Sequence, residues 1–330
     1  MSRTRELAEL ATAYDSGRSL GFRNRIINGG MVIDQRNNGA SVALNNSAAT
    51  FIVDRFSGYA SQNSKLTAQQ NAGSVTPPAG FTNYLGVTSI STHSISSGDI
   101  FLLSQMIEGF NTADLAFGTA SASSITLSFW VRSSLTGTFG GVIQNSAQNR
   151  NYPFTFSVSA ANTWEQKSVT IAGDTSGTWV TNNGVGLRLQ FAMGTGSTYL
   201  GTPGAWTSSE VYGATGQTNL VATNGATFYI TGVQLEAGSV ATPFERRPYG
   251  TELALCQRYY TGGQLYTEAG VSPGGIVLAT GFFKTTMRAA PIVTSSGTSG
   301  MFIDNISQDV FRAYRIGALF SISWTASAEL

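Results

Sequence analysis

The sequence predicts an all-β protein, and three observations support this prediction. Only 11% of the 330 residues are charged, well under the roughly 25% that is usual for soluble domains. Gly occupies 38 positions. Most of the chain consists of short runs of alternating apolar and polar residues separated by Gly, Asn and Ser, which is typical of the strands and turns of a sandwich or barrel. At roughly 150 residues per domain, the length predicts two domains, or three with a short appendage.

The charge balance and the scarcity of Cys and His exclude several function classes. Nineteen basic and eighteen acidic residues give a formal net charge of +1, which lacks the basic footprint of a protein that binds nucleic acid or an anionic membrane. Cys256 and His93 are single residues of their types, so one chain forms no internal disulfide and no Cys/His zinc cluster. The sequence contains no run of 18 apolar residues and no signal-peptide core. We therefore expect no membrane insertion and a soluble product made in a cytoplasm.

Residues 1–25 differ in pattern from the rest of the chain. Four apolar side chains follow the i, i+3, i+4, i+7 spacing of one helix face, namely Leu7, Leu10, Ala11 and Tyr14. A helix of about three turns is marginal on its own and needs a partner surface. It either packs on its own domain or serves as a segment for docking or self-association.

Two segments show the alternation of half-buried strands most clearly. In residues 125–133, Leu127 and Phe129 point to one face, whereas Trp130 and Arg132 point to the other. Residues 185–191 place Leu187 and Leu189 on one face and Arg188 and Gln190 on the opposite one. Residues 164–171 and 227–235 are further strand candidates. A Gly/Ser/Thr-rich excursion over residues 194–225 carries Tyr199, Trp206 and Tyr212, and a loop of this length is either functional or covers a neighbouring surface.

Two prolines within residues 243–250 mark a domain boundary. The next ten residues, 251–260, favour a helix. After them come about 70 residues of short apolar runs and turns, which predict a second, smaller β domain with strands in residues 275–283, 290–293 and 317–324.

Several motifs, taken in their order along the chain, resemble the fibre and spike proteins of tailed phages, prophages and phage-derived particles. They are NRIINGGMVIDQR (24–36), VDRF (53–56), VQLEAGSVATPFE (233–245), ELALCQRYY (252–260) and MRAAP (287–291). The resemblance implies an N-terminal attachment segment (1–25), a jelly roll similar to carbohydrate-binding modules (26–245), a helical connector (246–260) and a C-terminal β-sandwich knob (261–330). It also implies a homotrimer. Because only about 25 residues precede the jelly roll, we expect a short spike or a terminal fibre segment, which another virion protein holds through residues 1–25.

Sugar binding requires an aromatic face that stacks on a pyranose ring and a few planar polar groups that take the hydroxyls. The candidate glycan-binding residues are Trp130, Arg132, Arg188, Gln190, Tyr199 and Trp206. The first four face away from the core of two strands, and the last two can overhang them from the excursion. The alternative for the aromatic residues is core packing, loop anchoring or an oligomer contact, and for Arg132 and Arg188 it is an ordinary surface or interface role.

Catalysis has weaker support in the sequence. His93 lies in a Ser/Thr-rich stretch without a G-x-S-x-G motif nearby. A glycosidase needs only two carboxylates, and the jelly-roll segment holds five obvious ones, Asp54, Asp99, Glu108, Asp114 and Glu165. We expect these acids to cap turns, to bind a structural cation or to face solvent. The chain is therefore predicted not to be an enzyme.

We also expect no cofactor and no metal site. Asp34 and Asp54 are conceivable calcium ligands, but the sequence has no D-x-D-x-D-G loop. Near the boundary, arginines and tyrosines cluster beside Glu245 and Glu252, which suits a subunit interface because Arg and Tyr are enriched there. That cluster comprises Arg246, Arg247, Arg258, Tyr249, Tyr259 and Tyr260.

These observations predict a virion fibre or spike protein on the particle surface, made in the bacterial host cytoplasm, that attaches the particle to host surface polysaccharide. Two alternatives stay open. One is a connector or capsid-decoration protein that binds no glycan, and the other is a capsule depolymerase, although the repeated turns of a β-helix are missing from the sequence.

Overall fold

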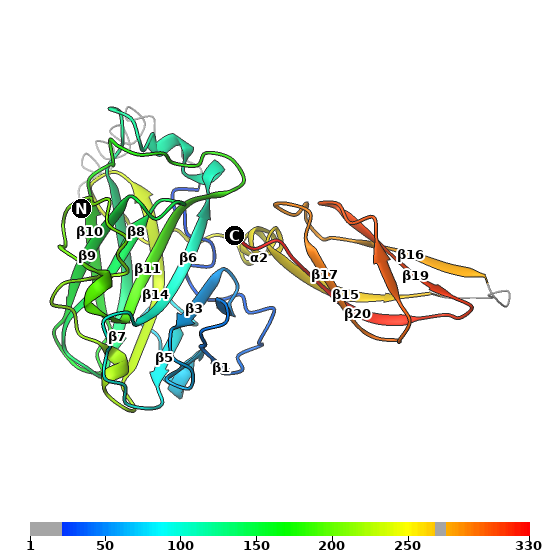
Figure 1. Ribbon diagram of the computed structural model, residues 1–330, viewed down its shortest axis with the longest axis horizontal. Helices are drawn as coiled ribbons and strands as arrows, with labels where there is room; N and C mark the ends of the chain where they lie inside the picture. The colour runs from blue at the N-terminus through cyan, green and yellow to red at the C-terminus, as the bar shows by residue number, and fades with distance from the viewer. Residues whose placement is uncertain (1–21, 268–274) are drawn as a thin grey trace.

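The computed structural model describes residues 22–267 and 275–330, which form two β units joined by a short helix (Figure 1). The all-β prediction is confirmed. The helix expected within residues 1–25 lies outside the described residues, except for residues 22–25, which have no regular secondary structure. Among the described residues, no helix has both the length and the apolar character needed to cross a membrane.

The larger unit is a sandwich of two six-stranded antiparallel sheets, as far as the chain is described. Sheet A has the order β1 (Val42–Ala43), β4 (Leu66–Gln70), β5 (Leu85–Ser89), β14 (Thr227–Ala237), β7 (Ile125–Ser133) and β10 (Glu165–Ile171). Sheet B has the order β2 (Thr50–Val53), β3 (Phe56–Ala60), β6 (Ile100–Glu108), β11 (Val185–Thr195), β8 (Gly137–Gln144) and β9 (Asn151–Val158). The chain passes repeatedly from one sheet to the other, which gives the predicted jelly roll. Within the excursion, β12 (Leu200–Gly201) and β13 (Gly213–Ala214) form a short parallel pair.

Alternate residues of the strands build the core between the two sheets. Phe129 of β7 is 1% exposed, and its ring centroid lies 4.9 Å from that of Phe156 and 5.1 Å from that of Phe191, both in sheet B. Both contacts are edge-to-face, a geometry that contributes about 0.5–1.5 kcal/mol per pair beyond the burial of area. The intervening residues of each strand point away from the core, so they are the ones available to a ligand.

The motif at residues 233–245 closes the sandwich. The buried carboxylate of Glu236 accepts hydrogen bonds from Gln234 Nε2 at 2.9 Å and from the backbone N–H and hydroxyl of Thr242 at 2.9 and 2.7 Å. Glu245 accepts a hydrogen bond from the backbone N–H of Asn24 at 2.9 Å. The motif thus ties the first described segment of the sandwich to its last strand.

The smaller unit is the predicted C-terminal β unit, which we call the knob. Its sheet D has the order β15 (Tyr260–Tyr266), β20 (Ser321–Ser327) and β17 (Ile292–Gly297), and its sheet E has the order β16 (Ile276–Phe282), β19 (Val310–Ile316) and β18 (Phe302–Asp304). Phe311 and Trp324 pack between the sheets with ring centroids 5.0 Å apart. The knob therefore has a hydrophobic core of its own.

The helix α2 (Tyr249–Gln257) lies at the junction of the two units, within the segment 246–260 expected to be a helical connector (Figure 1). Glu108 at the end of β6 accepts hydrogen bonds from Arg258 and Tyr259, and Arg247 donates to the carbonyl of Asn24. Arg247, Arg258 and Tyr259 of the Arg/Tyr cluster therefore have partners within the chain itself, and a contact of the cluster with another subunit stays a prediction.

Candidate functional site

The structure separates the residues predicted to bind glycan. Trp130 and Arg132 lie on β7 in sheet A, whereas Arg188 and Gln190 lie on β11 in sheet B. Since each pair points away from the shared core, the two pairs occupy opposite outer faces of the sandwich. The expectation of one surface built from all four residues is therefore wrong. Alternation shows which side of a strand a residue takes, but it does not show the sheet to which the strand belongs.

A groove of about 280 Å³ crosses the outer face of sheet B over β3, β6 and β11. Ser57, Ser104 and Gln190 occupy directly paired positions on these three strands, so they form a polar row across the groove. One row further along, Tyr59 pairs with Leu102. The floor of the groove thus offers polar groups beside an apolar strip, the combination found in small-molecule sites.

Gln190, which lines this groove, holds an unsatisfied polar atom. The side chain is 4% exposed, and its Oε1 atom is buried without a hydrogen-bond partner. A buried acceptor left without a partner costs about 1–3 kcal/mol, and native proteins keep few such groups without a functional reason. The side-chain amide of Gln190 thus keeps unused hydrogen-bonding capacity beside the groove.

Arg188 lies one row further along β11, opposite Met106 of β6. Its Nη1 lies 3.7 Å from Met106 Sδ, its Nη2 lies 3.4 Å from the carbonyl oxygen of Ser146, and its Nε is buried without a partner. Burial lowers the pKa of Arg188 from its usual value. The guanidinium keeps donor capacity because its present contacts are long.

Tyr212 of the excursion forms one wall of the groove. Its backbone N–H donates to the carbonyl of Tyr199 at 2.8 Å, and the two rings pack edge-to-face with centroids 5.3 Å apart. Gln148 Nε2 donates to the Tyr212 hydroxyl at 2.9 Å, and that hydroxyl donates to Glu210. Burial raises the pKa of Tyr212. Tyr199 therefore lies beside Tyr212, next to the groove, and holds Tyr212 in place.

Trp206 lies outside this groove. Its ring packs between Phe117, Tyr152 and Trp179, and its Nε1 donates to the carbonyl of Ala172 at 2.8 Å. The residue thus anchors the excursion on the sandwich, which is the alternative that the sequence left open.

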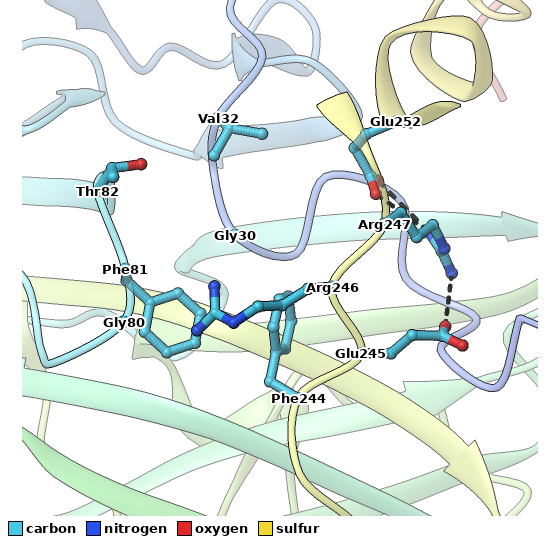
Figure 2. Close-up of a pocket in the computed structure, with 10 residues that line it drawn as sticks. All are labelled: Gly30, Val32, Gly80, Phe81, Thr82, Phe244, Glu245, Arg246, Arg247 and Glu252. Carbon is cyan, nitrogen blue, oxygen red and sulfur yellow. Dashed lines mark hydrogen bonds and ion pairs between the residues drawn. The ribbon is translucent and has the colours of Figure 1, made fainter. Parts of the chain in front are cut away.

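A second hollow lies on the outer face of sheet A and has a volume of about 470 Å³. Trp130 lines it together with Phe81, Phe244 and Arg246, and a recess of about 130 Å³ shares the last three residues (Figure 2). The Arg246 guanidinium lies 4.7 Å from the Phe81 ring centroid and 5.6 Å from that of Phe244. The arginine thus already occupies these aromatic faces.

The charged side chains beside the second hollow also have partners within the fold. Arg247 forms ion pairs with Glu245 and Glu252, both drawn in Figure 2. On the same sheet, Arg132 Nε donates to the carbonyl of Asn162 at 3.0 Å, and its guanidinium carbon lies 5.5 Å from the Tyr229 ring centroid. The hollow of sheet A is therefore the weaker candidate for a sugar site.

The five acids considered for glycoside cleavage take part in contacts of the fold. The pairs are Asp54 with Gln35, Asp99 with His93, Glu108 with Arg258, Asp114 with Arg25 and Glu165 with Lys167. Burial raises the pKa of Asp54. Burial also acts to raise the pKa of Asp99, but hydrogen bonds, led by the one from His93, outweigh it and lower the pKa to about 2.

The described residues contain no group of three or more His, Cys, Asp or Glu side chains placed to hold a metal ion. Asp34, a conceivable calcium ligand, accepts hydrogen bonds from the backbone N–H groups of Asn37 at 2.9 Å and Gly39 at 2.6 Å. Its carboxylate therefore stabilises a turn.

No protein-family model matches the sequence, and no curated protein matches it either. Among solved structures, a putative sugar-binding protein from Bacteroides thetaiotaomicron is 12% identical, with a TM-score of 0.34 over 65% of this chain and 99% of that one. A family 11 carbohydrate-binding module from Clostridium thermocellum, in complex with a β-1,3-1,4-mixed-linked tetrasaccharide, is 10% identical, with a TM-score of 0.30 over 61% and 98% of the two chains.

The enzymatically active domain of tailspike protein 4 of bacteriophage CBA120 is 12% identical, with a TM-score of 0.33 over 65% of this chain and 21% of that one. The present chain thus spans about a fifth of that tailspike chain. All three TM-scores lie below 0.5, so the structural similarity is distant.

Proposed function

We propose that this chain is a non-enzymatic fibre or spike protein of a phage or phage-like particle, and that the groove of sheet B holds host surface polysaccharide. One observation carries the proposal of sugar binding. The polar row Ser57, Ser104 and Gln190 includes a buried, unpaired acceptor and lines the same groove as two tyrosines, Tyr59 and Tyr212. A sugar ring presents hydroxyls at its rim and C–H groups on its faces, and this groove offers partners to both.

Each sugar contact in this groove should be weak, because the site is shallow and forms few direct hydrogen bonds. We propose that the chain acts as a homotrimer, so that several grooves engage one polysaccharide and the effective affinity rises through multivalency. Residues 1–25 would join the chain to another virion protein. The trimer, the virion surface and this attachment are supported by the resemblance of the motifs at residues 24–36, 233–245 and 252–260 to phage fibre proteins.

The proposal of a non-enzymatic role is supported by what the carboxylates do. The five acids considered above have hydrogen-bond partners in the fold. Among the described residues that line the groove of sheet B, none is an Asp or a Glu. A capsule depolymerase would need two carboxylates that flank the scissile bond. Incubation of the protein with host capsule should leave the chain length of the polysaccharide unchanged, and shortened chains would contradict this part of the proposal.

A binding experiment tests the groove. The purified chain is screened on a panel of bacterial surface polysaccharides, and the best ligand is titrated against Gln190→Leu. This substitution nearly conserves the side-chain volume and removes an acceptor that has no partner in the fold, so the protein should keep its stability. We expect the affinity to fall at least about tenfold, as for the loss of one good hydrogen bond.

Trp130→Ala is the matched control, because it removes a partly exposed aromatic residue from the hollow of sheet A. The control should bind as tightly as the unaltered chain. Binding that survives Gln190→Leu but is abolished by Trp130→Ala would place the sugar site on sheet A and contradict the proposal. A chain that binds no host polysaccharide at all would favour the connector hypothesis.

A further inference from the structure

The outer faces of the two knob sheets differ in character. Outward positions of sheet D carry mostly polar side chains, namely Gln264, Thr294, Ser296, Ser321, Ser323 and Thr325, whereas the exposed apolar residues Tyr266 and Ile292 lie at opposite ends of that sheet. Outward positions of sheet E carry large apolar side chains that are between 51% and 70% exposed, namely Ile276, Leu278, Phe282, Phe302 and Ile316. We call these five residues, together with Tyr314, the apolar face of the knob.

Five of the six members form a continuous patch because they lie in register, and Phe282 lies beyond the row formed by Thr280, Arg312 and Asp304. Ile276 of β16 pairs with Ile316 of β19, and Leu278 pairs with Tyr314, which in turn pairs with Phe302 of β18. The rings of Phe302 and Tyr314 are stacked, with centroids 5.1 Å apart. Three strands therefore contribute to a single patch, unlike the scattered apolar side chains that every protein surface carries.

The size of this patch lies in the upper part of the range that a monomer usually exposes. A large side chain presents on the order of 200 Å² when fully exposed, so the five exposed members offer roughly 600 Å² together. The largest apolar patch of a typical monomer measures roughly 300–600 Å² and is often functional. A stable interface buries roughly 800 Å² on each partner, and the apolar face supplies most of that area.

We propose that the apolar face packs against the same face of further copies of this chain. The apolar composition of the face favours further copies of this chain over a different, charged partner. Permanent interfaces between identical chains are apolar, like the hydrophobic core of a domain. The two charged residues within the face satisfy each other, since Arg312 Nη2 lies 2.5 Å from Asp304 Oδ2. The face thus has no unbalanced charge that would select an oppositely charged protein. The inference rests on the proposed function only for the number of copies, three.

The mass of the full chain in solution tests this inference. Sedimentation velocity should give the unaltered protein a multiple of 34.8 kDa, and a double variant, Leu278→Lys with Phe282→Lys, should sediment as a single chain. The matched control, Thr294→Lys with Ser323→Lys, adds the same charge to the polar face of sheet D and should keep the mass of the unaltered protein. A second variant, Leu278→Thr with Phe282→Thr, keeps strand-forming residues and should also dissociate if the lysine variant fails to fold.

Two results would overturn the inference. One is an unaltered protein that is monomeric over the whole concentration range, and the other is a folded variant of the apolar face that keeps the full oligomeric mass. Titration of the dissociated variant with polysaccharide separates this inference from the proposed function. We expect the dissociated chain to bind polysaccharide with the affinity of a single groove. Lost self-association with retained binding would therefore concern the apolar face alone, and lost binding would concern the groove of sheet B.

Discussion

Arg258 and Glu108 form a two-point ion pair across the junction between the sandwich and the knob. Arg258 Nη2 lies 2.7 Å from Oε1 of Glu108, and Nε lies 3.1 Å from Oε2. The Glu108 side chain is 1% exposed and also accepts a hydrogen bond from the Tyr259 hydroxyl at 2.7 Å. The hydrogen bond to Glu108 raises the pKa of Arg258. The residues that follow α2 thus hold the knob to the end of β6.

Glu108→Gln should lower the free energy of unfolding by about 1–3 kcal/mol, because a neutral amide replaces the buried carboxylate that accepts hydrogen bonds from Arg258 and Tyr259. Denaturant unfolding of the full chain measures the change. Asp114→Asn, which removes an exposed partner of Arg25, serves as the control and should change the stability by less than about 1 kcal/mol. Equal effects of the two substitutions would contradict the role given to Glu108.

Asp99 should make the stability depend on acid pH. Its folded-state pKa of about 2 lies below the usual 3.8, so the deprotonated carboxylate favours the folded state. The contribution is fully present above pH 4 and is lost as the pH falls through about 2. Asp99→Asn should therefore destabilise the protein by on the order of 1–2 kcal/mol at neutral pH. Thermal unfolding at a series of pH values should show the two proteins converging as the pH falls to about 2 and below, and a difference that persists there would speak against this account.

Gly281→Ala should destabilise the knob, because a Cβ atom at this position would lie 2.2 Å from the Phe311 ring. We expect a loss of about 1–3 kcal/mol from the forced repacking. Gly250 of α2 has open space around its Cβ position, so Gly250→Ala should instead stabilise the helix by about 0.5–1 kcal/mol. Calorimetry measures both changes, and the same sign for both variants would refute the assignment of Gly281 to a packed site.

Trp206→Ala should lower the stability of the sandwich by about 3 kcal/mol, because the ring packs against Phe117, Tyr152 and Trp179. Thermal unfolding measures this loss. At a temperature at which the variant stays folded, its affinity for polysaccharide should match that of the unaltered chain. Normal stability combined with lost binding would instead identify Trp206 as a ligand-binding residue.

Local patterns predicted the strands well wherever polar and apolar residues alternate. The strand expected over residues 125–133 has those bounds as β7, and the candidate at residues 164–171 corresponds to β10 (Glu165–Ile171). The sequence analysis did not single out β6, whose residues Ile100–Glu108 begin with a continuous apolar run. Such a run can equally form a buried helix segment, so its hydrophobic pattern does not distinguish a strand from a helix.

The groove of sheet B was predicted only in part. Arg188, Gln190 and Tyr199 come from segments that the sequence marked, and they lie in or beside the groove. Ser57 and Ser104 lie in the groove only because β3 pairs with β6 and β6 pairs with β11, contacts between segments far apart in the sequence. A single sequence shows the face on which a side chain lies, whereas the order of strands in a sheet depends on the packing of the whole chain. For the same reason, Trp130 could not be assigned to the opposite sheet.

The methyl signal of Met106 offers the most direct test of where the polysaccharide binds. The chain has six methionines, of which Met106 lines the groove, whereas Met31, Met193 and Met287 are buried elsewhere. In a methyl NMR titration of ¹³C-methionine-labelled protein with a bound oligosaccharide, the Met106 signal should shift and the signals of the three buried methionines should stay in place. An oligosaccharide that binds by calorimetry but leaves Met106 unshifted would contradict the central claim that the groove of sheet B is the sugar site.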